Sequence, residues 1–229
     1  MKPRLSIILP VLNEGECLGV ALQALQVLRL DCELIVVDGG STDLSLAMAP
    51  PLADKVVSSP RGRAKQMNAG ADAAKADIFL FLHADTALPD GSVDLITKVI
   101  EDGWNWGRFD VQFDAPQPIF KLIAWMMNLR SRLSGIATGD QAIFLTRKAF
   151  EAVGGFPDIA LMEDITLSSR LKKLGKPCCL RAKVTTSARR WQRHGILKTI
   201  VLMWRLRLTY FFGADAAVLA ARYYPKKHQ

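Results

Sequence analysis

The stretch "IFLFLHADTALPDG", residues 78–91, decides the fold class of this chain of 229 residues. Five apolar residues, 78–82, run directly into the polar segment that contains His83 and Asp85, and a Pro-Asp-Gly turn signal follows at 89–91. A short run that is apolar on both faces is typical of a strand inside a parallel sheet. Ligands bind at the carboxyl ends of such strands, so His83 and Asp85 are candidate site residues. The alternative is that Asp85 caps the next turn or helix.

The first half of the chain alternates between strand patterns and helix patterns. Strands are predicted over 4–10, 33–38, 55–59 and 78–82, and helices over 15–29, 41–49 (with Ser41 or Thr42 as the cap) and 65–75. This order predicts βαβ units and a parallel sheet, so the fold class is α/β.

The second half is less regular, and no linker rich in Pro, Gly or Ser divides it from the first, which favours one domain. Helices are predicted over 120–133 and 165–174, a half-exposed antiparallel strand over 106–113, and further strands over 140–147 and 178–188.

The net charge of +8 is unevenly distributed along the chain. Residues 1–100 hold 9 Lys/Arg and 12 Asp/Glu, whereas residues 165–229 hold 15 Lys/Arg and one acid, Asp215. This asymmetry indicates that the C-terminal region contacts an anionic surface, either nucleic acid or membrane, or that it is a solvated basic face. The four cysteines fit no zinc spacing and indicate reduced thiols in the cytosol. The N-terminus reads as a strand and not as a signal peptide.

Polar residues follow three of the first four predicted strands. Asn13 and Glu14 follow the first, the "DGGSTD" segment that begins at Asp38 follows the second, and His83 and Asp85 follow the fourth. Parallel strands place these three groups along one edge of the sheet. Carboxylates there suit a ribose or a base more than a phosphate. Between them, the cations at 61, 63 and 65 begin a helix, where free N–H groups favour a diphosphate. Each group alone also fits a cap or a turn.

Six segments occur in an order that resembles the signature of family 2 glycosyltransferases. They are "SIILPVLNE", "IVVDGGSTD", "RAKQMNAG", "FLHADT", "GDQAIF" and "MEDITLSSRLKKLG", from about residue 4 to residue 190. The resemblance implies the GT-A fold, a Rossmann-like single domain with a mainly parallel sheet, and an inverting transfer of a sugar from a nucleoside diphosphate sugar to an acceptor hydroxyl. The "LHADT" and "GDQAIF" wording is similar to a short branch associated with radical-SAM and arsenosugar biosynthesis.

The resemblance also implies roles for single residues. Asp38 matches the acid that binds the base, and Pro10, Asn13 and Glu14 line the same pocket. Arg63 matches an arginine near the base and diphosphate. Asp164, beside Glu163, matches the catalytic base.

The same resemblance implies a divalent metal, Mn²⁺ or Mg²⁺, on the donor diphosphate. Asp85 matches the last acid of the D-x-D motif that holds it. His83 stands where the first acid is expected, which moves the ligand set away from oxygen alone. Asp140 is expected on the acceptor side, or as a turn residue before a strand. The acceptor itself, a lipid or a small molecule, is not named by the sequence.

Two other functions fit parts of the pattern. A sugar nucleotidyltransferase has a similar core, but such enzymes carry a glycine-rich basic loop after the first strand, where this chain has the acidic "PVLNEGE". A non-catalytic nucleotide-binding or nucleic-acid-binding protein fits the basic tail, but no nucleic-acid motif is present, so no nucleic acid is expected as partner.

The C-terminal segment, 191–229, is predicted to be a basic amphipathic helical extension of a GT-A domain at 1–190. Its longest uncharged stretch, 208–214, is far below the roughly 20 residues needed to span a bilayer. Aromatic residues at 204, 210–212 and 223–224 are typical of a membrane interface. We expect a helix that lies in the plane of the cytoplasmic membrane face. The rival interpretation is that the segment closes the core or contacts a second copy of the chain.

Overall fold

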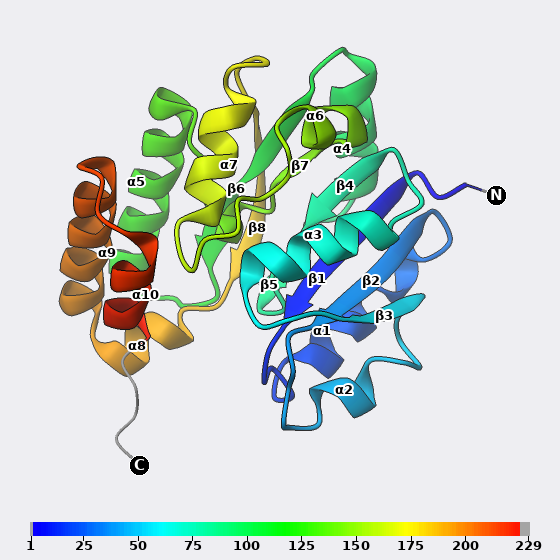
Figure 1. Ribbon diagram of the computed structural model, residues 1–229, viewed down its shortest axis with the longest axis horizontal. Coiled ribbons are helices and arrows are strands. Elements are labelled where there is room, and N and C mark those ends of the chain that lie inside the picture. Colours follow the sequence, from blue (N-terminus) through cyan, green and yellow to red (C-terminus); the bar gives the residue numbers. More distant parts are fainter. Residues whose placement is uncertain (1, 225–229) are drawn as a thin grey trace.

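The computed structural model describes residues 2–224 and contains one eight-stranded sheet with helices on both faces (Figure 1). The strand order is β3-β2-β1-β4-β7-β6-β8-β5. The strands are β1 (Leu5–Val11), β2 (Cys32–Asp38), β3 (Lys55–Ser58), β4 (Ile78–Phe81), β5 (Thr86–Ala87), β6 (Trp106–Phe113), β7 (Phe144–Thr146) and β8 (Cys178–Thr186). Strands β1 to β4 pair in parallel, as predicted. Strand β7 is antiparallel to β4 and β6, and β6 and β8 are parallel.

Ten α-helices and two 3₁₀ turns connect these strands within residues 2–224. They are α1 (Leu18–Ala24), η1 (Gln26–Leu28), α2 (Ser45–Met48), α3 (Arg63–Ala73), α4 (Ser92–Glu101), α5 (Pro118–Ser134), η2 (Gly139–Gln141), α6 (Arg147–Ala152), α7 (Glu163–Leu171), α8 (Arg189–His194), α9 (Ile196–Phe211) and α10 (Ala216–Tyr223).

The sheet divides the core into two apolar layers because its central strands are buried on both faces. Side chains alternate along β1, so that Ile7 and Leu9 pack on the side of α1 and α4, whereas Ile8 packs on the side of α3, α6 and α7. Helix α3 approaches β1 closely at Gly70, where an added Cβ would meet the side chain of Ile8. This close contact brings the start of α3 to the edge where β1 ends.

Some predicted boundaries are wrong. Helix α2 begins at Ser45, and Ser41 is not its cap, because the Ser41 hydroxyl accepts a hydrogen bond from the Asn13 N–H. The predicted strand at 140–147 begins only at Phe144, after the 3₁₀ turn η2. The predicted helix at 15–29 is split into α1 and η1.

Strand β6 pairs antiparallel with β7, as its alternating sequence predicts, but it is buried along most of its length and not half-exposed. Arg108 and Asp110 occupy polar positions of the alternation, and both are buried. They form an ion pair with each other, and Arg132 of α5 donates a 2.6 Å hydrogen bond to Asp110. Asn128 of α5 bonds both the N–H and the C=O of Val111. The polar positions therefore face partners on α5 and not water.

The C-terminal helices pack against the rest of the fold on one side. Leu206 of α9 and Leu219 of α10 are buried against Leu161 and Met162, which precede α7. Figure 1 shows α9 beside α5 and α10 beside the lower end of α7. No helix among residues 2–224 is both long enough and apolar enough to cross a membrane.

Candidate functional site

The carboxyl ends of β1, β2 and β4 meet at one edge of the sheet, so the three predicted polar groups lie along that edge. Asp38 ends β2, is 5% exposed, and accepts hydrogen bonds of 3.0 and 3.1 Å from the N–H groups of Gly40 and Ser41. Asn13 is in the left-handed region with φ 55° and accepts a 2.8 Å bond from the Thr42 N–H. Both side chains therefore shape the loops that border the edge.

His83 lies beside Asp140, which comes from a distant part of the sequence. The Nδ1 atom of His83 is 3.4 Å from Oδ1 of Asp140, and the other end of the imidazole lies against the Cα atom of Gly139. A Cβ atom at position 139 would overlap Nε2 of His83, so this contact requires glycine. Burial raises the pKa of Asp140. The hydrogen bond and charge of His83, with the charges of Arg63 and Arg207, have the larger effect, so the pKa of Asp140 lies below its ordinary value.

Glu163 and Asp164 form the first turn of α7. Asp164 accepts a 2.8 Å hydrogen bond from the Gly139 N–H and a 2.7 Å bond from the Ile165 N–H, one on each carboxylate oxygen. Met162 precedes the helix in the left-handed region with φ 71° and turns the chain into it. These two bonds fix the orientation of the Asp164 side chain at the N-terminal end of α7.

Glu163 is 6% exposed and faces an arginine across the site. Burial raises the pKa of Glu163 above its ordinary value, the charge of Asp164 acts in the same direction, and the charge of Arg63 opposes both. Arg63 begins α3 and is exposed, so its guanidinium is accessible to a ligand. A small cavity joins these elements, and it is lined by Arg63, Met67, Phe81, His83, Gly139, Ile143, Phe156, Glu163 and Asp164.

Comparison with known proteins identifies the family. Residues 6–154 match the model described as "Glycosyl transferase family 2". The chain belongs to that family. A "PGL/p-HBAD biosynthesis glycosyltransferase" from Mycobacterium bovis is 38% identical over 96 residues, and this match covers 38% of the chain and 37% of that relative. The matched region thus spans little more than a third of the curated relative.

Solved structures share the fold of this family 2 chain at low sequence identity. TarS 1–349 of S. aureus has a TM-score of 0.64 at 18% identity, with 81% of this chain and 60% of that chain covered. The mannosyltransferase PcManGT of Pyrobaculum calidifontis, solved with GDP-Man and Mn²⁺, has a TM-score of 0.61 at 21% identity, with 81% and 57% covered. These similarities confirm the predicted GT-A fold.

Asp85 is the carboxylate that the sequence predicts as a ligand of a metal on a bound diphosphate. It is half-buried at the end of β4, and its side chain accepts one long hydrogen bond, 3.4 Å, from the Thr86 hydroxyl. Among residues 2–224, no three His, Cys, Asp or Glu side chains gather in a metal-binding group. Mg²⁺ is commonly held by one or two carboxylates, substrate phosphates and water, so a single free carboxylate at this edge fits such an ion. His83, the other predicted metal ligand, has its Nδ1 atom 3.4 Å from Oδ1 of Asp140.

Several residues that lie near the site were not predicted from the sequence. Arg189 of α8 lies 3.5 Å from Glu14. Arg190 stacks 3.7 Å from the ring centre of Tyr223, whose pKa burial raises to about 12. The clustering of basic and aromatic residues at the C-terminus was the available signal, and it left open both a membrane contact and packing of the segment on the core. The C-terminal helices border the site directly.

Proposed function

We propose that this family 2 chain is an inverting glycosyltransferase that moves a sugar from a nucleoside diphosphate sugar to an acceptor hydroxyl. The observation that carries the proposal is Asp164, an oriented carboxylate beside the edge where β1, β2 and β4 end. Curated relatives named glycosyltransferases support the reaction class. The names of structural relatives include UDP-GlcNAc and GDP-Man as bound donors, which supports a nucleotide sugar. Assignment to the short radical-SAM-associated branch is part of the proposal.

The donor is proposed to lie along the strand ends. Asp38 and Asn13, with Pro10 and Glu14, border the nucleoside pocket, and Arg63 at the start of α3 supplies positive charge for the diphosphate. Asp85 would hold Mg²⁺ or Mn²⁺ against the diphosphate. When bound, that ion neutralises charge that develops on the departing nucleoside diphosphate.

Inversion requires one in-line displacement at the anomeric carbon, with a base that takes the acceptor proton. Asp164 is proposed as this base, since each of its oxygens accepts one backbone hydrogen bond and keeps further acceptor capacity. Glu163, with its raised pKa, is proposed to set the electrostatics of the pocket beside it. Asp140 is proposed to face the acceptor side and to be positioned by His83.

A thermal-shift screen of nucleotide sugars, each with Mn²⁺, Mg²⁺ or EDTA, tests the donor. A ligand at about 100 times its dissociation constant adds about 2.7 kcal/mol, which raises the unfolding midpoint of a chain of this size by about 2–4 °C per kcal/mol. The stabilising donor is then assayed for release of nucleoside diphosphate. Release of pyrophosphate from a nucleoside triphosphate and a sugar phosphate would instead identify a nucleotidyltransferase, and absence of any nucleotide binding would reject both.

We also propose that the chain contacts the cytoplasmic membrane peripherally through α5, which belongs to the catalytic part at 1–190, and through α9, which belongs to the C-terminal extension at 191–229. The inner face of the extension packs on the core, but large apolar side chains remain exposed on both helices: Leu122, Trp125, Met126, Leu129, Leu133, Leu197, Val201, Trp204, Leu208 and Phe211. Exposed cations adjoin them at Lys121, Lys198, Arg205 and Arg222. An apolar face bordered by cations complements an anionic lipid surface.

Co-sedimentation with phosphatidylglycerol vesicles tests this contact, with phosphatidylcholine vesicles as the control. Binding that falls at high salt supports the membrane. A protein that stays in the supernatant at low salt but sediments as a dimer in the ultracentrifuge would assign the apolar face to a second copy of the chain.

A further inference from the structure

Part of the Arg130 guanidinium, on α5, is buried in the fold without a hydrogen-bond partner. Its Nε and Nη2 atoms are inaccessible and donate to no acceptor in residues 2–224. Arg207 of α9 is half-buried, and none of the ion pairs in the described part of the chain includes either arginine. Buried polar atoms of native proteins are nearly always hydrogen-bonded, and a buried unpaired charge is destabilising.

Arg130 on α5 and Arg207 on α9 lie within electrostatic reach of each other, and each is about three turns beyond a residue of a shared apolar cluster. The helices touch near their beginnings, where Ile119 of α5 and Ile196 of α9 belong to one apolar cluster. Figure 1 shows the two helices side by side. Arg130 lies 11 residues beyond Ile119, and Arg207 lies 11 residues beyond Ile196. Eleven residues make about three turns, so each arginine repeats the face of the contact residue about 16 Å along its helix.

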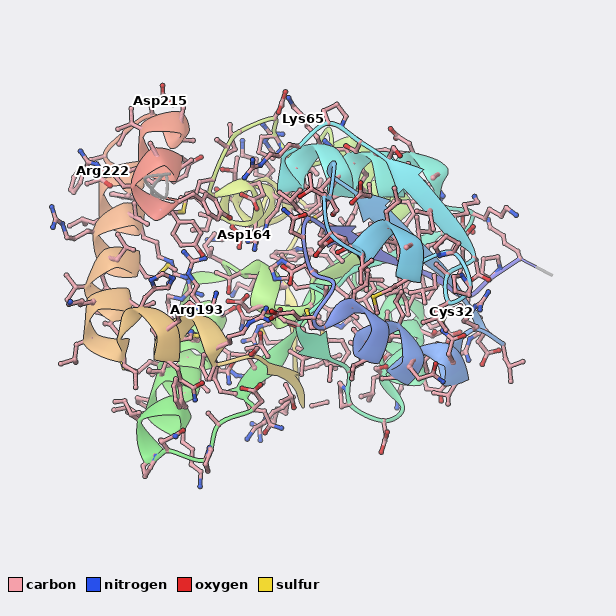
Figure 2. All side chains as sticks on the ribbon, turned by 90° about the horizontal axis from the view of Figure 1, so that it is seen from below. Cys32, Lys65, Asp164, Arg193, Asp215 and Arg222 are labelled. Atoms are coloured by element: carbon pink, nitrogen blue, oxygen red, sulfur yellow. The ribbon has the colours of Figure 1, made fainter. Side chains whose placement is uncertain are left out.

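The charges of nearby residues act on Arg130. Burial lowers the pKa of Arg130 to about 10, the charge of Arg207 acts in the same direction, and the charges of Asp164 and Asp140 oppose both. An arginine remains protonated at neutral pH under these conditions. Figure 2 shows Asp164 between the C-terminal helices and the sheet. The charges of these two acids therefore act on Arg130 from the candidate site.

We propose that Arg130 and Arg207 form a subsite for an anionic oxygen group, a phosphate or a carboxylate, that the acceptor carries near its reacting hydroxyl. Two guanidinium groups with free donors match the planar, paired acceptors of such a group. The anion would also relieve the repulsion between the two cations. This inference rests on the proposed glycosyl transfer, and it names the acceptor class for the same site.

Binding of inorganic phosphate tests the subsite without requiring the acceptor to be known. The midpoint of thermal unfolding is measured in phosphate and in chloride of equal ionic strength, for the wild type and for Arg130→Met, Arg207→Met and Arg205→Met. Arg205 is the matched control, because it lies two residues from Arg207 on α9 and is exposed in a groove away from Asp164.

We expect phosphate to stabilise the wild type and Arg205→Met. Arg130→Met and Arg207→Met should each weaken phosphate binding about 10-fold or more, the loss of a hydrogen bond to a charged group. Unchanged phosphate binding in both variants overturns the subsite. If Arg130→Met does not fold, the half-buried Arg207 decides the outcome, with Arg207→Lys as the milder change.

Two further arms distinguish the source of the anion. Stabilisation by glycerol 3-phosphate but not glycerol, lost in Arg207→Met, indicates a soluble acceptor. Binding to phosphatidylglycerol vesicles that is lost in Arg207→Met but kept in Lys98→Met, which changes an exposed cation on α4 outside the proposed membrane face, indicates a lipid headgroup. If no anion of either kind responds to the two substitutions, the proposal fails.

The test of the subsite and the test of glycosyl transfer can fail independently. Phosphate bound through both arginines in a protein that binds no nucleotide sugar would leave the subsite standing and reject glycosyl transfer. A protein that binds a nucleotide sugar, and whose phosphate response is the same in all variants, would lose the subsite alone. In turnover, phosphate should compete with the acceptor and not with the donor.

Discussion

The backbone N–H of Gly139 donates a 2.8 Å hydrogen bond to Oδ2 of Asp164, and the Cα atom of the same glycine lies against the imidazole of His83. One residue thus connects the end of β4 with the start of α7, which are separated by about 80 residues in the sequence. The position of the proposed base depends on this contact.

Gly139→Ala should disturb both neighbours at once. The added methyl group overlaps the His83 ring, and overpacking of this kind typically destabilises by about 1–3 kcal/mol. Urea unfolding measures this loss, and a turnover assay should show a fall in rate. His83→Ala makes room for the methyl group, so the double variant should recover part of the stability that Gly139→Ala loses. Strict additivity of the two changes would contradict the contact.

Asp164→Asn should lower turnover by about 10²–10⁴-fold, the usual effect of losing a general base. The amide keeps the shape of the carboxylate but cannot take the acceptor proton. Donor affinity, measured by calorimetry, should change little because the base faces the acceptor. Wild-type turnover in this variant, with a large loss in Glu163→Gln instead, would move the role of base to Glu163.

Asp85→Ala should weaken metal-dependent donor binding by about 10–100-fold or more, because removal of residues that merely support a metal ligand already has effects of that size. Calorimetry of the donor with Mn²⁺ and with EDTA makes the comparison. Asp90→Ala, an exposed acid in the following turn, is the matched control. Equal donor affinity with and without metal in the wild type would remove Asp85 from this role.

Glu163→Gln should stabilise the protein at neutral pH but not under acidic conditions. The folded state raises the pKa of Glu163 above its ordinary 4.5, so it binds the proton more tightly than the unfolded chain does. Stability therefore falls as pH rises from about 4.5 through the raised pKa, and the glutamine variant escapes this fall. Urea unfolding at pH 4.5 and 7.5 measures the difference, and an equal effect at both values would contradict it.

Asp110→Asn should destabilise the fold by about 3–5 kcal/mol, since it leaves the buried Arg108 guanidinium without its counter-charge. Asp77→Asn breaks an exposed ion pair with Lys2 and should change the free energy of unfolding by about 0–1 kcal/mol. Similar losses in the two variants would show that the β6 network contributes no more than a surface pair.

The sequence predicted β1, β2 and β4 closely because strands buried on both faces leave uninterrupted apolar runs, as at 78–82. Helix α4 was missed although Val93, Ile96 and Val99 have helical spacing. The burial of β6 could not be predicted, because an alternating pattern does not reveal that its polar residues pair with residues of α5. The single C-terminal helix proved to be three, with breaks at Gly195 and Gly213, both at positive φ.

Part of the candidate site was also predictable from the sequence, and part was not. Residues at strand ends, such as Asp38 and Asp85, were predictable because parallel strands bring their carboxyl ends to one edge. The residues that α5 and α9 place near the site, Arg130 and Arg207, were not predictable, since no sequence pattern shows where these two helices pack.

The hydroxyls of Thr166 and Tyr210 lie 2.6 Å apart, so a hydrogen bond joins α9 to α7, the helix that begins with Glu163 and Asp164. The family match ends at residue 154, before that helix begins. A chimaera joined at residue 154 would therefore exchange the two acids together with α9 and α10, their packing partners. A junction near residue 190 would instead combine Glu163 and Asp164 of this chain with α9 and α10 of another protein. We expect a chimaera joined at residue 154 to be more stable than one joined near residue 190, because it keeps the contact between Thr166 and Tyr210.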